Sequence, residues 1–440
     1  MTLRDILKTK TVSVWGVGYL GYTSMLALQQ GGFDIVAYDL HRHQLEKMKG
    51  GDYPDKEQAA VWSRVNYLPK LDRDKIKIAN SPAGLFRSSS IHIIAMSEFR
   101  ETTKGDNMVK RMAAIFAANL RKGRTVPLVI FESTSVPGHI EENFVKPLAA
   151  RGIRCSRDYY LGAIFRPDWT TEAFMNRKGK LPIAGHCLKG LAAVKRLTEY
   201  LGIRTIELDG IKEGEIYINS MNAIQVVVSD FLRQLVLGYP SVNIKKISER
   251  LFKNISFDDC AVNIGSGGEK ETFAIDNLIR GSESQEALAL LKEFQDSGIS
   301  SVLSYAEYIV RHGYKSVAML GITYKGNQKD VVLSPSLTLA DYLLKNSVRV
   351  WLNDPFYSSK DIVKLVKGAR AADFPDGVFD ADVVVVSSDH NQYRYLSQER
   401  LDGIKKKTRL VIDNIGVWSH LKFDGGIYHQ VGDGSLNLLK

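Results

Sequence analysis

The sequence predicts an α/β fold in which two doubly wound parallel sheets are joined by a central helical region with one long helix. Three observations predict it: short apolar runs alternate with helix-like stretches in both halves, a glycine-rich turn follows the first run, and a long apolar stretch separates the halves. The chain has 440 residues, 44% hydrophobic and 25% charged. This composition supports two or three domains with buried cores and excludes disordered, collagenous and coiled-coil proteins.

The first half contains four short apolar runs that are typical of buried strands. They are Thr11 to Trp15, Ile35 to Tyr38, Ile91 to Ala95 and Leu128 to Phe131. Four runs of the same kind return in the second half, at Ser316 to Leu320, Val348 to Leu352, Val383 to Val386 and Leu410 to Ile412. Helix-like stretches lie between the runs, so each half follows the β-α-β order of a parallel sheet.

Residues 212–237 predict the long helix, because Gly214 is their one glycine, proline is absent, and apolar residues occupy more than one face. A helix with so much apolar surface needs a partner, and we expect a second copy of the chain, in a homodimer. The predicted boundaries are 1–207 for the first α/β domain, 208–312 for the helical region and 313–440 for the second α/β domain.

The turn after the first run carries the strongest local motif. Gly16, Gly18 and Gly21 have the spacing G-x-G-x-x-G between a predicted strand and a predicted helix, with Tyr19 and Leu20 inside the motif. These glycines permit a tight turn, close approach of a pyrophosphate and close packing of helix on strand, and the helix N-terminus offers N–H donors to phosphate. The sequence therefore predicts a Rossmann-like dinucleotide site.

The residue that ends the second predicted strand indicates which dinucleotide binds. Asp39 lies 18 residues after Gly21, where a carboxylate accepts hydrogen bonds from ribose hydroxyls and repels a ribose phosphate. This favours NAD over NADP. Arg42 follows closely, and its charge would soften the repulsion.

The charge balance and the cysteine content indicate which partners and which cellular location to expect. Lys and Arg outnumber Asp and Glu by 59 to 49, a net charge of +10 that favours anionic partners such as nucleotides. We expect no nucleic-acid partner, because no basic helix with interleaved aromatic residues is found. Neither a signal peptide nor a membrane-spanning run is evident, so we expect a cytoplasmic protein without membrane contact. Cys155, Cys187 and Cys260 are far apart in sequence, which predicts no disulfide framework, and with nine scattered histidines no structural metal.

Five motifs in order make the chain resemble the UDP-glucose and GDP-mannose dehydrogenase family. They are "WGVGYLG", "FESTSVPG", "MLGITYKGNQKDVVLSPS", "VWLNDP" and "VIDNIGVW". The resemblance covers nearly the whole chain. It implies two Rossmann-like domains, a homodimer, and NAD-dependent oxidation of the primary alcohol of a UDP- or GDP-linked sugar to a carboxylate. It places NAD on the first domain and the nucleotide sugar in the cleft toward the second.

The resemblance also implies roles for individual residues. Ser133 and Thr134 would lie at the NAD site, with Thr134 near the nicotinamide and holding the reacting alcohol or its water. Asp168, in "FRPDW", stands where the family has a glutamate that assists the catalytic water. Asn222 matches an asparagine on the long helix that contacts the substrate, and Lys325 would contact the sugar nucleotide.

The sequence departs from the family at two positions of the expected catalytic site, those of a lysine and of the cysteine that makes the second oxidation possible. Ile218 stands where the family has a lysine that stabilises developing negative charge. The family's Gly-Gly-x-Cys loop has its counterpart in "NIGSGGEKETFAIDNLI", with Gly267 and Gly268 expected at the substrate. The position of the cysteine falls on Lys270 or on Thr272, depending on the alignment, and neither is a thiol.

Three further residues complete the comparison with the family. Asp276 matches an aspartate beside the cysteine that helps to draw the alcohol proton through water. Two arginines that the family uses around the nucleotide sugar are replaced by Val332 and Ile415, which leaves fewer groups for binding a diphosphate.

Two functions therefore remain open from sequence. The first is a nucleotide-sugar dehydrogenase that transfers one hydride from a sugar hydroxyl to NAD and stops at an aldehyde or ketone, because the family's catalytic cysteine is not evident and Cys260, five residues before Gly265, has no neighbouring base or cation in the sequence to activate it. The second is a non-catalytic or regulatory homologue that retains the fold and the NAD site but has lost turnover. The sequence identifies neither the sugar nor the carbon that is oxidised.

Overall fold

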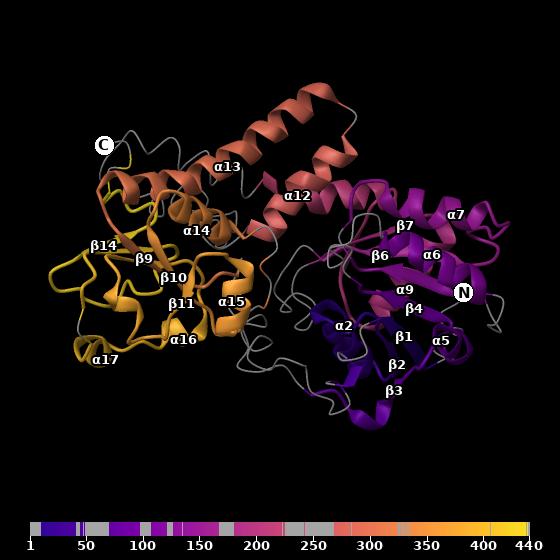
Figure 1. Cartoon of the computed structure of the whole chain (residues 1–440). Coiled ribbons are helices and arrows are strands. Elements are labelled where there is room, and N and C mark those ends of the chain that lie inside the picture. Colours follow the sequence, from indigo (N-terminus) through magenta and orange to yellow (C-terminus); the bar gives the residue numbers. More distant parts are fainter. Residues whose placement is uncertain are drawn as a thin grey trace. The chain divides into compact units, whose positions relative to one another are not determined.

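The structure is a computed structural model, and it divides into two compact units, residues 1–220 and 221–440. It describes residues 10–40, 45–46, 48, 70–96, 107–120, 126–133, 135–166, 180–221, 223–224, 242, 268–282, 284–323, 326, 329, 331, 334–404, 406–436 and 438. Each unit contains one sheet with helices packed on it (Figure 1). Among these residues no helix is long and apolar enough to cross a membrane.

The sheet of the first unit has the strand order β3-β2-β1-β4-β5-β6-β7-β8 among the described residues. Its strands are β1 Thr11–Trp15, β2 Asp34–Tyr38, β3 Ile76–Ile78, β4 Ile91–Ile94, β5 Leu128–Phe131, β6 Tyr160–Ile164, β7 Leu181–Gly185 and β8 Thr205–Glu207. All neighbouring strands run parallel except β6 and β7, which pair antiparallel. The chain order reverses between β1 and β4, and this switch point is where parallel α/β sheets bind their ligands.

Helices cover both faces of this sheet. They are α2 Tyr19–Gln30, α5 Pro82–Ser88, α6 Met108–Asn119, α7 Lys146–Ala149 and α9 Leu188–Tyr200, with a π-helical turn Glu141–Val145 and a 3-10 turn Arg73–Lys75. Strand alternation divides the core in two. Val12 and Val14 of β1 pack with α2 and α9 on one face, whereas Trp15 packs with α5 and α6 on the other. Residues 211–221 form a further helix that continues at 223–224.

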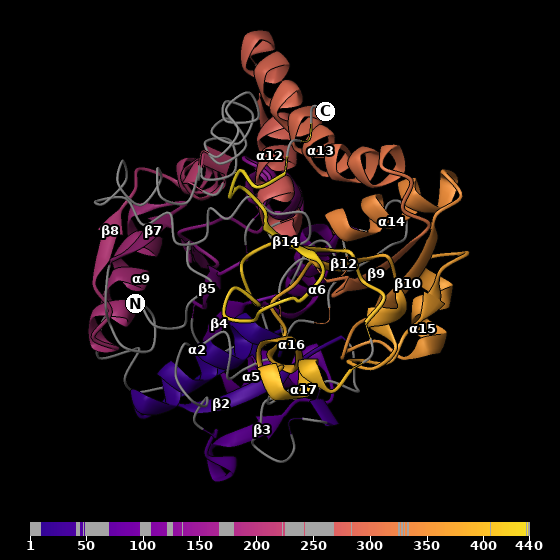
Figure 2. The same cartoon turned by 90° about the vertical axis from the view of Figure 1, so that its left-hand side faces the viewer.

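The sheet of the second unit is parallel throughout its described strands, in the order β11-β10-β9-β12-β13-β14. The strands are β9 Ser316–Leu320, β10 Arg349–Asn353, β11 Arg370–Ala371, β12 Val383–Val386, β13 Leu410–Asp413 and β14 Ile427–Gln430. Figure 2 shows β9, β10 and β12 side by side. The four strands of the second sheet nearest its switch point are β10, β9, β12 and β13. They follow the same order as β2, β1, β4 and β5 in the first sheet, so the two sheets share this part of their topology.

The helices of the second unit also lie on both faces of their sheet. They are α12 Gly268–Gly281, α13 Gln285–Arg311, α14 Pro335–Lys345, α15 Ser359–Leu365, α16 Asn391–Arg394 and α17 Gln398–Asp402, with a 3-10 turn Val378–Asp380. Val317 and Met319 of β9 pack with α13 and α14 in one core. Ala318 and Leu320 face the other core, around the fully buried Trp418.

The structure confirms the α/β class and each of the eight predicted strands, with ends that agree within one residue. The predicted long helix is confirmed for its described part, which begins at residue 211 and reaches residue 224; the remainder of its predicted length lies outside the described residues. Strands β3, β6, β7, β8, β11 and β14 are not among the predicted ones. The three predicted domain boundaries remain a prediction.

One buried carboxylate organises the carboxyl edge of the second sheet. Asp413, which ends β13, accepts hydrogen bonds from the backbone N–H groups of Gly416, Val417 and Trp418, and from the Tyr428 hydroxyl at 2.9 Å. Burial raises the pKa of Asp413, and these hydrogen bonds oppose the rise. The turn fixed in this way inserts Trp418 into the core, so the "VIDNIGVW" segment has a structural role here.

We predict that Asp413→Ala destabilises the protein by about 3 kcal/mol, because the buried N–H donors of Val417 and Trp418 and the partly buried Gly416 N–H and Tyr428 hydroxyl lose their acceptor. Urea unfolding followed by tryptophan fluorescence measures this, with the exposed Asp424→Ala as a matched control that should leave the midpoint unchanged. Equal midpoints for the two variants would contradict the role given to Asp413.

Candidate functional site

The glycine-rich turn follows β1 at the switch point of the first sheet. Gly16 has φ +91°, a left-handed conformation that favours glycine, and its N–H donates to the Tyr38 carbonyl at 2.8 Å. A Cβ on Gly16 would lie 2.7 Å from the Ala95 oxygen, and one on Gly21 would lie 1.9 Å from the Gly16 oxygen. Any side chain at either position would force the turn apart. The structure therefore gives both glycines the packing roles that the motif predicts.

Gly18 differs from these two, because a Cβ there would meet no atom within 4 Å. It is the N-cap of α2, whose first turn contains no acidic residue and receives no hydrogen bond from a capping side chain. The open space above Gly18 therefore borders the N-terminal N–H groups of a helix. Such a place suits a phosphate, since the helix dipole and the N–H donors both favour negative charge there.

Asp39 follows β2 beside this turn and is buried. Its Oδ2 accepts the N–H of Val17 at 2.9 Å, so the carboxylate is held against the backbone between Gly16 and Gly18. The turn, the helix start and the acid thus meet at one edge of the sheet. This arrangement fits an NAD molecule, with pyrophosphate at Gly18 and adenosine ribose toward Asp39.

Behind the turn lies a buried charged cluster that sequence reasoning missed. Glu132, at the end of β5, accepts a hydrogen bond of 2.5 Å from Ser24 on α2, and its Oε2 lies 3.9 Å from Arg166 Nη1. Burial raises the pKa of Glu132, and the charge of Arg166 and the Ser24 hydroxyl oppose the rise. Arg166 also donates to Thr23 Oγ1 at 2.9 Å and lies within hydrogen-bond distance of the Leu20 carbonyl. The cluster joins α2 to β5 and β6.

A second buried acid fixes the segment that follows Ser133. Glu215, on the helix of residues 211–221, accepts hydrogen bonds from Ser135 Oγ at 2.5 Å and from the Gly138 N–H at 2.6 Å. Asn219, one turn later, donates to the Ser135 carbonyl at 2.9 Å. Ser133 itself donates to the Met96 carbonyl at 2.5 Å, which ties the ends of β4 and β5 together. Glu215 was recognisable only as a helical acid, because its partner lies 80 residues away.

Ile218 lies on the same helix as Glu215 and is 1% exposed, within the core that contains Trp15 and Phe131. On the same helix, three residues earlier, lies the buried acid Glu215, whose carboxylate is held by Ser135 and Gly138. The match of Ile218 to the family's lysine remains a prediction.

Asp276 lies on α12 and forms an ion pair of 2.7 Å with Arg280, one turn later. The side chain of Asp276 is 26% exposed, so water reaches it. Its neighbour Ile275 packs with Ala223 in a small apolar cluster. Ala223 and Ile275 are adjacent in sequence to Asn222 and Asp276, so the cluster joins the two segments that carry these predicted substrate-site residues.

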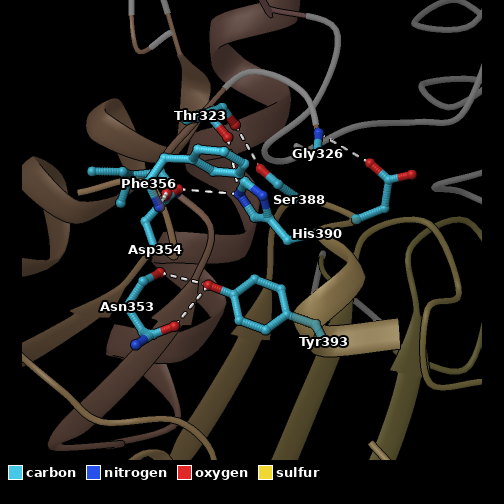
Figure 3. Close-up of polar contacts among 10 residues, drawn as sticks. Thr323, Gly326, Asn353, Asp354, Phe356, Ser388, His390 and Tyr393 are labelled. Carbon is cyan, nitrogen blue, oxygen red and sulfur yellow. Dashed lines mark hydrogen bonds and ion pairs between the residues drawn. The ribbon is translucent and has the colours of Figure 1, made fainter. Parts of the chain in front are cut away.

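The second sheet contains a turn with the same backbone geometry as the first, but its carboxylate has additional partners within the protein. Gly321 has φ +88°, its N–H donates to the Asn353 carbonyl at 2.8 Å, and the next N–H, of Ile322, donates to Asp354 Oδ2 at 2.9 Å. Asp354 also accepts the N–H of Phe356 and lies 3.1 Å from His390 Nε2 (Figure 3). The carboxylate that corresponds to Asp39 is thus engaged within the protein.

His390 also lies 3.1 Å from Thr323 Oγ1, but this is not a catalytic relay. Both contacts are made by Nε2, whereas a hydroxyl–histidine–carboxylate relay uses the two different ring nitrogens. All three side chains are buried. Ser388 donates to the Thr323 carbonyl, and the Gly326 N–H donates to Asp389 at 3.0 Å. Residues 388–390 therefore hold both described ends of the segment 323–326, in which Lys325 lies (Figure 3).

Several predicted site residues lie outside the described residues: Arg42, Thr134, Asp168, Asn222, Gly267 and Lys325. Tyr19 begins α2, and Gly268, Lys270 and Thr272 belong to α12, but the structure describes no side-chain placement for Tyr19, Lys270 or Thr272. The choice between Lys270 and Thr272 for the family's cysteine position stays open.

Comparison with known proteins gives matches along most of the chain. The model of the NAD binding domain of the UDP-glucose/GDP-mannose dehydrogenase family matches residues 10–177. The model of the UDP binding domain of the same family matches residues 318–420. The first match contains the Gly16 turn and Asp39, and the second contains the Gly321 turn and Asp354.

Individual relatives are distant but match over nearly their full length. The UDP-N-acetyl-D-mannosamine dehydrogenase of Methanocaldococcus jannaschii is 21% identical, with 97% of each chain covered. The GDP-mannose 6-dehydrogenase of Pseudomonas savastanoi pv. phaseolicola is also 21% identical, with 94% of this chain and 98% of the relative covered. The structure of a UDP-glucose dehydrogenase from Pyrobaculum islandicum superimposes with a TM-score of 0.74 at 18% identity, covering 96% of this chain and 97% of that one.

The same family thus accounts for both sheets, in their order along the chain. It also explains why NAD suits the turn of the first sheet. On this evidence, the chain belongs to the UDP-glucose/GDP-mannose dehydrogenase family.

Proposed function

We propose that this protein oxidises a hydroxyl group of a UDP- or GDP-linked sugar by hydride transfer to NAD, and that the reaction stops after two electrons. The observation that carries the proposal is the intact dinucleotide turn at the carboxyl edge of the first sheet, in a chain where the family's catalytic cysteine is not evident from the sequence. Relatives named for UDP-N-acetyl-D-mannosamine and for GDP-mannose support the substrate class but do not select one sugar.

The chain's own residues would bind and orient the reactants. Gly18 and the N-terminus of α2 receive the pyrophosphate of NAD, and Asp39 receives the hydroxyls of its adenosine ribose. When bound, NAD supplies the nicotinamide ring that accepts the hydride. Asp276 is the proposed base, taking the alcohol proton through a water molecule, because its carboxylate is accessible to water. Thr134 and Asn222 are proposed to hold the alcohol, and Lys325 the nucleotide.

The missing thiol sets the proposed end point. Loss of hydride from an alcohol needs a base and an oriented acceptor, whereas oxidation of the resulting aldehyde needs a covalent adduct or hydrate. Lys270 and Thr272, the two residues aligned with the family's cysteine, do not supply a thiolate. Asp168, shorter by one methylene than the family's glutamate, is the proposed remnant of the hydrolytic step. The product released would therefore be an aldehyde or ketone.

The protein is further proposed to act as a homodimer. The helix of residues 211–224 leaves four apolar side chains exposed in the single chain: Ile216, Tyr217, Met221 and Ile224. Such a row on one helix is typical of a surface that another chain covers.

The buried pair Glu132–Arg166 is proposed to position the dinucleotide turn. Arg166 contacts Thr23 and the Leu20 carbonyl on the first turns of α2, directly below the N–H groups offered to phosphate. A buried charge pair of this kind contributes little net stability compared with apolar side chains, but removing one partner leaves the other charge uncompensated.

The end point is tested by the ratio of NADH formed to sugar consumed. Purified protein is incubated with NAD and a panel of UDP- and GDP-sugars, NADH is followed by absorbance, and products are identified by mass. We predict one NADH per sugar, because the second oxidation lacks its nucleophile. Two NADH per sugar would refute the two-electron end point. Binding of NAD without NADH from any sugar would instead favour a non-catalytic or regulatory protein.

The cofactor preference is tested at Asp39. We predict that the unsubstituted protein binds NAD more tightly than NADP, and that Asp39→Asn reduces the ratio of the two affinities by about tenfold or more, because the repulsive charge is removed. Asparagine keeps an oxygen that accepts the Val17 N–H, so the turn should persist. Dissociation constants from calorimetry provide the measurement, and an unchanged ratio would show that Asp39 does not face the ribose.

The positioning role is tested by substituting Arg166 alone and then both members of the buried pair. Arg166→Met should destabilise the protein by about 3–5 kcal/mol, because Glu132 is left buried without its partner, and should weaken NAD binding. Combining Arg166→Met with Glu132→Gln should restore much of the stability but not the affinity. Arg157→Met, which breaks an exposed ion pair with Asp158, is the matched control and should change neither. Loss of stability in Arg166→Met with unaltered NAD affinity would refute the positioning role.

A further inference from the structure

Two cysteines that are 32 positions apart in the sequence lie side by side in the first unit. The Sγ atoms of Cys155 and Cys187 are 3.6 Å apart, and both thiols are free and partly exposed. A disulfide bond requires about 2.05 Å between the sulfurs, so side-chain rotation must close a gap of about 1.5 Å. The proximity contrasts with the sequence-based prediction, which rested on the spacing of the cysteines along the chain.

The antiparallel pairing of β6 and β7 explains how the two thiols meet. Cys155 lies before β6 and Cys187 lies after β7, and Gly162 pairs with Gly185 at this end of the hairpin. A chain that returns antiparallel brings the residues before the first strand close to those after the second. The two cysteines thus stand at the open end of a strand pair, opposite the connection between its strands.

The environments of the two thiols are unequal. Cys187 is the N-cap of α9, and its sulfur accepts the Gly190 N–H at 3.4 Å. Burial acts to raise the pKa of the Cys187 thiol, but hydrogen bonds from the Ser156 side chain and the Gly190 N–H bring it below the ordinary value. Burial, and then the neighbouring Cys187, raise the pKa of Cys155 to about 12. Cys187 is therefore the thiol that ionises first.

A buried tyrosine completes the surroundings of the pair. Tyr159 is 0% exposed, and its hydroxyl has no hydrogen-bond partner among the described residues. Tyr159 forms a backbone β-bridge with Cys155. Burial raises the pKa of Tyr159, and negative charge on Cys155 or Cys187 raises it further, so the phenol stays protonated.

We propose that Cys155 and Cys187 form a reversible intramolecular disulfide when the protein meets a low-molecular-weight disulfide, with Cys187 as the attacking thiol and Cys155 as the resolving thiol. The reaction is independent of the proposed dehydrogenase activity. The proposal places an oxidative modification site at the edge of the first sheet where β6 begins.

The exchange proceeds in two steps that balance. The Cys187 thiolate attacks one sulfur of the oxidant RSSR, forming a mixed disulfide at Cys187 and releasing RS⁻. The Cys155 thiol then gives its proton to RS⁻ and its sulfur attacks the Cys187 sulfur, releasing the second RS⁻, which takes a proton from water. The two protein thiols lose two electrons, and RSSR gains them as it becomes two RSH. Formation of the mixed disulfide removes the Cys187 charge that disfavours ionisation of Cys155.

The position of the bond predicts its effects. The glycine-rich turn lies at the carboxyl end of β1, and β6 runs in the same direction as β5 and β1, so Cys155 lies at the opposite edge of the sheet. Oxidation should leave NAD affinity unchanged. It should raise Tm by about 5 °C or more, because the cross-link restricts the unfolded chain over the residues between the two cysteines.

The test uses the full-length protein with oxidised glutathione as the probe, followed by alkylation of remaining thiols, trypsin digestion and mass spectrometry. The expected product is the peptide Cys155–Arg157 joined to Leu181–Lys189, with the loss of two hydrogen atoms and full reversal by dithiothreitol. In the untreated reduced protein, Cys187 should alkylate about tenfold faster than Cys155.

Serine variants separate the roles of the two thiols. Cys155→Ser should stop at a glutathione adduct on Cys187, whereas Cys187→Ser should acquire less than about a tenth of that adduct on Cys155. Cys260→Ser is the matched control and should form the 155–187 linkage like the parent protein. Absence of the linked peptide in the parent, or adducts that form equally fast on Cys155 and Cys187, would overturn the proposal, and the first of these is measured without any variant.

Discussion

The fold of both sheets depends on one kind of hydrogen bond at the turn that follows the central strand, β1 in the first sheet and β9 in the second. In each turn, the N–H of the residue after the first glycine donates to a carboxylate that directly follows the neighbouring strand. Asp39 accepts from Val17 in the first sheet, and Asp354 accepts from Ile322 in the second, each at 2.9 Å. In both, the glycine has φ near +90°, and its own N–H donates to the residue before the carboxylate. This bond fixes where the chain leaves the first strand, and with it the edge at which a ligand can bind.

The two copies of the turn differ in the residues after the glycine, and this difference explains why the dinucleotide belongs to the first. After Gly16 comes Gly18, whose missing side chain leaves space directly at the start of α2. After Gly321 comes the buried Thr323, held by His390 and Ser388, and the next helix among the described residues, α14, begins at Pro335. The described part of the second turn therefore shows neither the open space nor the adjacent helix N-terminus that a pyrophosphate requires.

Sequence reasoning succeeded where the signal was local and failed where it depended on pairing. Buried parallel strands are continuous apolar runs, so the strands at both switch points and the Gly16 turn could be predicted. Strands β6 and β7 contain glycine and proline among their apolar residues, and their antiparallel pairing leaves no mark on either segment alone. The proximity of Cys155 to Cys187 depends on that antiparallel pairing. The contacts of Glu132 with Arg166 and of Glu215 with Ser135 depend on the pairing of β5 with β6 and on the packing of a distant helix, so none of the three could be predicted.

The substitutions that distinguish this chain from its family do not have equal structural consequences. Ile218 is packed within an apolar core, so an ammonium at this position would lose its hydration unless it reached the buried carboxylate of Glu215, three residues earlier on the same helix. Asp276, by contrast, keeps its charge and its contact with water, and Asp39 keeps its place at the turn. The residues proposed for the first hydride transfer are present, whereas the cysteine proposed for the second oxidation is not evident in the sequence, which is the pattern that the proposed two-electron reaction requires.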